Sequence, residues 1–105
     1  MKKAFKMKLY DGMLEEYQKR HQQVFPELLL EFKKAGLTDY SIWLDEESNF
    51  LFAYLNVGNV EIWNQISETE ACRKWWKFMA PIMETNLDDS PKSKDLILAY
   101  DYEKV

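Results

Sequence analysis

The order of elements in the sequence predicts an α+β domain of the ferredoxin-like class. Three observations support it: an alternating run near the N-terminus, two helical stretches with apolar stripes, and two neighbouring β-rich runs between them. A last alternating run completes the order β-α-β-β-α-β, which is the split β-α-β pattern of that fold. A chain of 105 residues with 15% aromatic side chains is suited to one compact core. We therefore expect a single domain over residues 1–105.

The first half of the chain is expected to hold one strand and one interrupted helix. Residues 4–9 alternate apolar side chains with lysine or alanine, at the period of two that is typical of a half-buried strand. Asp11 is the expected N-cap of a helix that ends near Lys34, before the stop signal at Gly36. Because Pro26 lacks an N–H group, we expect this helix to kink or break between residues 23 and 26.

The second half of the chain is expected to form a hairpin, two helices and a last strand. Residues 40–45 (YSIWLD) and 50–57 (FLFAYLNV) are rich in β-branched and aromatic side chains, and the polar turn between them predicts an antiparallel hairpin. Asn59 is suited to cap a short helix over residues 60–66. Ser67 and Glu70 have the spacing of a capping box, which predicts a helix from there to about Met83. Residues 96–102 alternate enough to form the fourth strand.

The predicted sheet has apolar side chains on both faces. Ile42 and Leu44 point to one face of their strand and Trp43 points to the other. One layer of helices covers only one of these faces, so the second face needs another cover. A second copy of the chain is the simplest cover, and we expect a two-fold homodimer.

Composition and charge exclude several classes of function. The net charge of −4 and the isoelectric point near 5.0 argue against a nucleic-acid partner, which is typically bound by a basic face. Cys72 and His21 are the only cysteine and histidine, too few for a structural zinc site, and no metal or other cofactor is expected. No stretch approaches the ~18 consecutive apolar residues of a membrane span. These features lead us to expect a reduced, cytoplasmic protein without a membrane partner.

Tyr17 and His21 are polar groups on an otherwise apolar helical stripe. Positions four apart are neighbours on one face of a helix, so the two rings should lie close together. Histidine has an ordinary pKa near 6.5 and can donate or accept a proton near neutral pH. Two interpretations stay open on this pattern. His21 is either a core histidine satisfied by hydrogen bonds or a proton-transfer group beside the predicted helix break.

Three further aromatic residues are candidate ligand contacts. Trp75 and Trp76 are adjacent on their helix and about 100° apart around its axis, so they belong to neighbouring stripes. They either serve helix–sheet packing or form an apolar wall with an N–H donor at its rim, which suits a sugar. Tyr40 shares a strand face with Ile42 and should bring its hydroxyl into the helix–sheet cleft, unless it is an ordinary packing residue.

Five sequence stretches together resemble the L-rhamnose mutarotase family: AFKMKL, EEYQKRH, YSIWLD, CRKWWKFM and NLDDSP. They follow one another in the family's order through nearly the whole chain. The resemblance implies a dimeric α+β barrel and an isomerase that interconverts the α and β anomers of L-rhamnose in rhamnose and carbohydrate metabolism. It also implies that His21 is the catalytic proton donor. It further implies that the substrate, L-rhamnose or a related monosaccharide, is bound by Tyr17, Tyr40, Trp75 and Trp76.

The implied chemistry agrees with these residue types. A pyranose changes anomer by opening to the aldehyde, which needs a proton delivered to the ring oxygen and another removed from the anomeric hydroxyl. A group of near-neutral pKa accelerates such transfers by about 10²–10⁴-fold. His21 is the expected acid, while the base is open between water, Tyr17 and a carboxylate of the loop over residues 86–91. The 6-methyl group of the sugar is expected near Phe25 or Met79.

Other functions use the same fold, so the fold alone does not decide. A cofactor-independent monooxygenase or a haem-degrading protein would use His21 as a base or an axial ligand. A non-enzymatic sensor would bind a small ligand with the same aromatic residues and without turnover.

Overall fold

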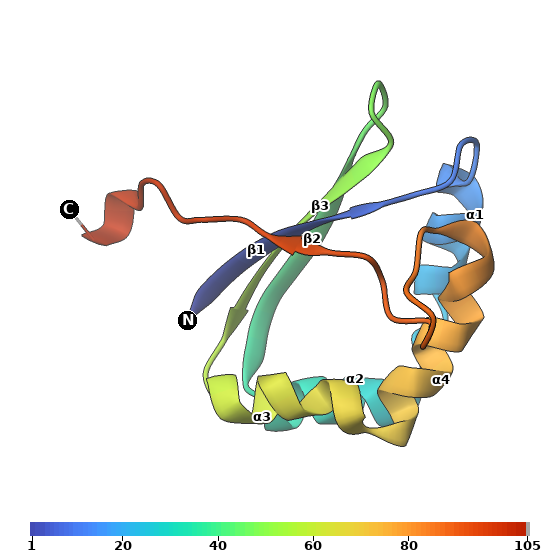
Figure 1. Ribbon diagram of the computed structural model, residues 1–105. Helices are drawn as coiled ribbons and strands as arrows, with labels where there is room; N and C mark the ends of the chain where they lie inside the picture. Colours follow the sequence, from blue (N-terminus) through green and yellow to red (C-terminus); the bar gives the residue numbers. More distant parts are fainter. Residues whose placement is uncertain (105) are drawn as a thin grey trace.

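The computed structural model describes residues 1–104 as a four-stranded antiparallel sheet with helices packed against one face (Figure 1). The strands and α-helices are β1 Lys2–Lys8, α1 Leu14–His21, α2 Pro26–Lys34, β2 Leu37–Asp45, β3 Phe50–Val57, α3 Val60–Gln65, α4 Glu70–Met79 and β4 Lys94–Asp95. Three short 3₁₀ helices complete the chain: η1 Ile66–Glu68, η2 Ala80–Ile82 and η3 Tyr102–Lys104. This order confirms the predicted ferredoxin-like class.

The sheet has the strand order β2-β3-β1-β4, and every neighbouring pair is antiparallel. The predicted hairpin is confirmed, with Ile42 opposite Ala53 and Trp43 opposite Phe52. Because successive residues of a strand face opposite sides, Ile42 and Ala53 point to the helices. Trp43 and Phe52 point to the other face, where their side chains are 61% and 37% exposed.

The predicted break at Pro26 is confirmed. The first helix ends at His21, and the second begins with Pro26 at its first position. Phe25, just before the proline, has the extended dihedrals φ −60° and ψ 133°. A proline suits the first turn of a helix because no N–H group is needed there. The break places His21 in the last turn of α1.

Two of the three predicted caps are wrong. The first helix begins at Leu14, and Met13 takes the capping position without a side-chain hydrogen bond, so Asp11 is not a cap. The N-cap of α4 is Thr69, whose hydroxyl accepts the N–H of Cys72 at 3.2 Å. Ser67 lies instead in η1, because a 3₁₀ turn precedes α4 and delays its start. The cap at Asn59 is confirmed, since its side chain accepts the N–H of Ile62 at 3.0 Å.

The predicted last strand over residues 96–102 is wrong, because none of these residues belongs to a strand and Tyr102 begins η3. β4 holds only Lys94 and Asp95, and one further bond runs from the N–H of Leu96 to the carbonyl of Ala4 at 2.8 Å. Beyond it the chain leaves the sheet edge and runs past the N-terminus, as the orange-to-red segment of Figure 1 shows. Ile97 is 94% exposed, so its apolar side chain is not buried by the described residues 1–104.

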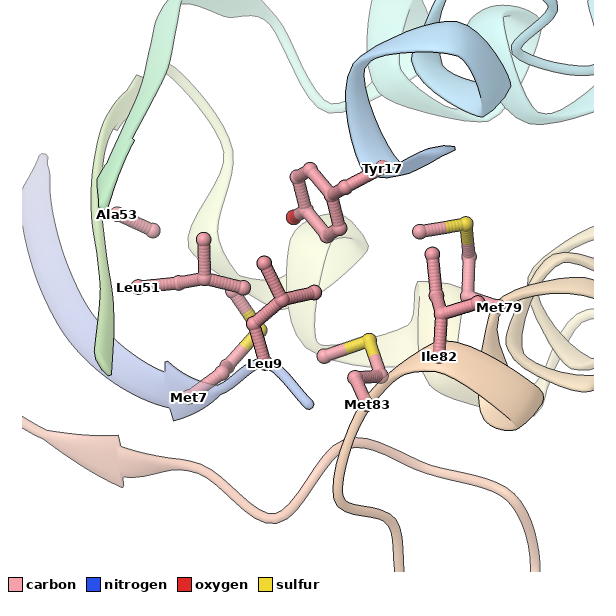
Figure 2. Close-up of a cluster of buried hydrophobic side chains, with 8 residues drawn as sticks. All are labelled: Met7, Leu9, Tyr17, Leu51, Ala53, Met79, Ile82 and Met83. Atoms are coloured by element: carbon pink, nitrogen blue, oxygen red, sulfur yellow. The ribbon is translucent and has the colours of Figure 1, made fainter. Parts of the chain in front are cut away.

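Two clusters of buried side chains form the core between the sheet and the helices. The first joins the sheet to α1 and the end of α4; its members, drawn in Figure 2, are Met7, Leu9, Tyr17, Leu51, Ala53, Met79, Ile82 and Met83. The second lies between α2 and α4 and contains Leu28, Ala35, Ile66 and Cys72. Over the described residues, no helix has the length and apolar content needed to cross a membrane.

Candidate active site

Tyr17 and His21 lie together on α1, as their spacing predicts. Their rings are stacked, with centroids 4.2 Å apart and planes inclined by 30°. The Nδ1 atom of His21 lies 3.0 Å from the backbone carbonyl oxygen of Tyr17. Because a carbonyl oxygen can only accept, Nδ1 carries the hydrogen and donates it. In the neutral ring the other nitrogen, Nε2, is therefore left with a free lone pair.

Trp75 reaches the same place from α4. Its indole stands at 88° to the imidazole of His21, with ring centroids 5.2 Å apart. Behind it, Phe25 makes a second edge contact at 5.2 Å and 88°. Arg20 ties the two helices together, because its guanidinium donates to the carbonyl of Phe78 near the end of α4. The imidazole is thus held between Tyr17 on one side and Trp75 on another.

Tyr40 enters from the sheet. It lies on the face of β2 that is turned to the helices, as predicted, and packs against the first core cluster with Ile42 and Leu44. Its ring contacts Phe32 of α2 at 6.1 Å and Trp63 of α3 at 6.2 Å between centroids. Helices and sheet therefore converge on one space from three directions.

Two cavities share the wall made by Tyr17, His21, Tyr40 and Trp75. The larger, about 750 Å³, opens between α1, α2 and the β2 edge and does not include Trp76 among its lining residues. The smaller, about 230 Å³, is lined by all five residues that the sequence suggested, Trp76 included. This smaller space, which we call the inner cavity, has room for one monosaccharide.

The polar atoms of these five residues make no hydrogen bond to the described part of the protein, apart from Nδ1 of His21. They are the hydroxyls of Tyr17 and Tyr40, Nε2 of His21 and the indole N–H groups of Trp75 and Trp76. None of these atoms is among the fully buried polar atoms without a hydrogen-bond partner, so each one is accessible from the cavity or from solvent. Unpaired donors and acceptors in an apolar cavity are what a small polyol requires.

Burial controls the protonation of the site. Desolvation lowers the pKa of His21 below 6.5, and the hydrogen bond to the Tyr17 carbonyl opposes this shift only in part. Desolvation raises the pKa of Tyr40 to about 12 and the pKa of the Cys72 thiol to about 11. The pKa of Tyr17 is raised further, by burial and by the neighbouring Tyr40. At neutral pH the imidazole, the phenols and the thiol are therefore all uncharged.

The expected loop carboxylates are not part of either cavity. Asp88 accepts hydrogen bonds from the backbone and hydroxyl of Ser90, and these bonds lower its pKa. The inner cavity is lined instead by Pro91 and Ser93 from the segment that follows. Of the two residues expected beside a sugar methyl group, Met79 lines the inner cavity, and Phe25 stands behind Trp75.

Sequence reasoning missed three polar residues of the inner cavity: Ser67, Cys72 and Ser93. Ser67 resembled a helix cap and Ser93 lay in a polar loop, so neither had a pattern that pointed to a cavity. Among residues 1–104, no three His, Cys, Asp or Glu side chains are grouped to hold a metal ion.

Comparisons with known proteins agree with this geometry. The family model described as L-rhamnose mutarotase matches residues 2–101. The L-rhamnose mutarotase of Clostridium beijerinckii is 51% identical over 96 residues, which are 91% of this chain and 92% of that protein. The crystal structure of an L-rhamnose mutarotase from Formosa agariphila matches with a TM-score of 0.87 and 42% identity, over 96% of this chain and 97% of that one.

A more distant structural match is an antibiotic biosynthesis monooxygenase. It matches with a TM-score of 0.60 over 95% of this chain and all of that one, at 7% sequence identity. A likeness at this level of identity shows the fold alone. It does not favour the monooxygenase alternative.

Proposed function

The chain belongs to the L-rhamnose mutarotase family, and we propose that its inner cavity binds one molecule of L-rhamnose beside His21. The protein is an isomerase that interconverts the α and β anomers of this sugar. The observation that carries the proposal is the set of unpaired polar atoms from Tyr17, His21, Tyr40 and Trp76 in one apolar cavity. A sugar has hydroxyls to satisfy such atoms and C–H faces to cover the aromatic rings.

The five residues divide into three roles. His21 is the proton-transfer group, because it is the member of the set whose pKa lies nearest to neutral. Tyr17 and Tyr40 stay protonated at neutral pH, so their hydroxyls bind and orient sugar oxygens. Trp75 and Trp76 supply the apolar wall, and the indole N–H of Trp76 gives one donor at its edge.

The apolar end of the inner cavity suits the 6-methyl group of L-rhamnose. Met7, Met79 and Met83 line it, and each is at most 5% exposed. Placing a hydroxymethyl group there would leave a hydroxyl without a partner, which costs about 1–3 kcal/mol. We therefore expect L-mannose, which carries a 6-hydroxyl, to be bound more weakly than L-rhamnose.

We further propose that the protein is a homodimer that works in the cytoplasm, in rhamnose metabolism. Trp43 and Phe52 form an exposed aromatic pair on the sheet face opposite the helices. The chain after Leu96 adds exposed Ile97 and Leu98. A second copy would cover both surfaces, since a two-fold interface uses the same patch on each partner. The single, unpaired cysteine suits a reducing compartment.

Magnetisation-exchange NMR on equilibrated L-rhamnose tests the activity. Catalytic amounts of the protein should increase the rate of exchange between the α and β anomeric protons above the rate in buffer. L-Mannose at the same concentration should show a smaller increase. Exchange at the buffer rate for L-rhamnose would contradict the proposed function, and equal acceleration of both sugars would contradict the methyl site.

A further inference from the structure

The inner cavity holds one side chain that changes its charge near neutral pH. Among the described residues, no Asp, Glu, Lys or Arg lines this cavity, and its other ionisable groups are Tyr17, Tyr40 and Cys72. Burial raises the pKa of all three, so none can give up a proton readily at neutral pH. The larger cavity adds a single carboxylate, Glu46. The inner cavity therefore offers His21 for two proton transfers and no obvious second side chain to share them.

The contacts of His21 define which nitrogen can act. Its Nδ1–H is committed to the carbonyl oxygen of Tyr17 at 3.0 Å, and the stacked ring of Tyr17 and the edge of Trp75 hold the imidazole plane. Arg20 on the same helix is engaged by Glu16 and by the carbonyl of Phe78. The Nε2 lone pair has no partner among residues 1–104.

Sugar geometry allows one nitrogen to serve both oxygens. The anomeric hydroxyl and the ring oxygen are bonded to the same carbon, so they lie side by side. A nitrogen at hydrogen-bond distance from one needs only a small displacement to reach the other. A second protein group on the far side of the ring is not required.

We propose that Nε2 of His21 performs both proton transfers, with the backbone carbonyl of Tyr17 as the positioning group that fixes the reactive tautomer. This rests on the proposed function of the inner cavity. In this mechanism His21 still delivers a proton to the ring oxygen, as expected from the sequence. It adds the removal of the anomeric proton, for which the sequence left the base open.

The steps balance without any co-reactant. Neutral Nε2 takes the proton of the anomeric hydroxyl, and the O–H electrons form the carbonyl as the bond from carbon to the ring oxygen breaks. The departing ring oxygen keeps that bond's electron pair and takes the proton from the imidazolium. Rotation about the C1–C2 bond then presents the other aldehyde face. The same two transfers run backwards, and His21 ends neutral.

A pH profile separates this mechanism from one with two groups. The active form is the neutral imidazole, so exchange above the buffer rate should rise with pH through one midpoint below 6.5 and then stay level to about pH 9. A bell-shaped profile, or a rate that falls as His21 loses its proton, would overturn the single-group mechanism. Catalysis would still be observed in that case, so the proposed function would survive.

Two variants identify which groups contribute. Glu46→Gln should leave the pH–rate profile unchanged. If this variant changed the rise or the fall of the profile with pH, Glu46 would be a second proton-transfer group, and the inference would be overturned. Tyr17→Phe keeps the backbone carbonyl, so it should keep the midpoint while raising KM. A midpoint that vanishes in Tyr17→Phe would assign a transfer to the phenol instead.

The tautomer can be measured directly because His21 is the only histidine of the chain. Long-range ¹H–¹⁵N NMR of the free protein above the midpoint should show a protonated Nδ1 and an unprotonated Nε2. A neutral ring with its proton on Nε2 would overturn the inference, since that nitrogen would then be unable to accept. This measurement does not depend on turnover. If His21 were purely structural, its NMR titration would not have to match the midpoint of the pH–rate profile.

Discussion

The indole of Trp75 stands perpendicular to the imidazole of His21, at 88° and 5.2 Å between ring centroids. The same indole packs on Phe25 and Phe78, so it supports the wall of the site and the core behind it. Trp75 packs against both core clusters and lines both cavities. Its direct neighbour Trp76 packs against the second core cluster and lines the inner cavity but not the larger one. Two adjacent tryptophans therefore have separable tasks.

Replacing each tryptophan with alanine should have different consequences. Trp75→Ala removes packing from three aromatic neighbours, so we expect about 3 kcal/mol loss in the free energy of unfolding and a lower kcat. Trp76→Ala should mainly raise KM, because it removes sugar contacts. Urea unfolding and exchange kinetics measure the two effects. Equal destabilisation, with unchanged KM in Trp76→Ala, would place both residues in the core alone.

The turn from α2 to β2 depends on Gly36. Its φ is +73°, and an added Cβ would lie 3.2 Å from the backbone nitrogen of Gly58, whose N–H donates to the Gly36 carbonyl at 3.0 Å. Gly12 has a similar φ of +76° but open space around it. Gly12→Ala should cost about 1 kcal/mol from the left-handed backbone alone, and Gly36→Ala clearly more.

Thermal or urea unfolding of the two glycine variants measures that difference. The excess in Gly36→Ala reports the close approach between the two backbone segments. This turn sets the start of β2, which carries Tyr40. Gly36→Ala should therefore also displace Tyr40 and reduce the rate of anomer exchange. Equal costs in both variants would show that the contact with Gly58 relaxes freely.

The proposed homodimer can be tested at the exposed sheet face. Trp43→Glu places a charge beside Phe52 on the surface expected to meet the second copy, so sedimentation should show a shift from dimer to monomer. Leu87→Glu is the control, because Leu87 is fully exposed on a loop and should leave the mass unchanged. A monomeric wild-type protein, or a Trp43→Glu protein that remains a dimer, would contradict this interface.

Local sequence patterns predicted most of the fold. The first strand, the hairpin and the break at Pro26 follow from local rules, since each depends on side-chain period or on a missing N–H group. The last strand was not predicted correctly. Alternating side chains form a strand only where a neighbouring strand pairs with them, and in this part of the described chain only Lys94 and Asp95 pair with β1. Cap spacing also failed at Ser67, where a 3₁₀ turn intervenes.

The candidate site was predictable where it lay on regular elements. Helical spacing brought Tyr17 to His21, and strand alternation turned Tyr40 inward. The loop that lines the cavity had no such period, so Ser93 was overlooked, and the acidic residues before it stayed among three open alternatives for the base. The tautomer of His21 depends on a backbone carbonyl, which sequence patterns do not reveal.

In the proposed mechanism, this chain interconverts the anomers of L-rhamnose through His21. Magnetisation-exchange NMR on equilibrated L-rhamnose, with wild type and His21→Gln at equal concentration, tests it most directly. Glutamine retains polarity and similar size but cannot titrate, and circular dichroism serves as the control for folding of the variant. We predict rapid exchange with wild type and the buffer rate with the folded variant. Exchange at the buffer rate with wild type, or at the wild-type rate with His21→Gln, would contradict the account.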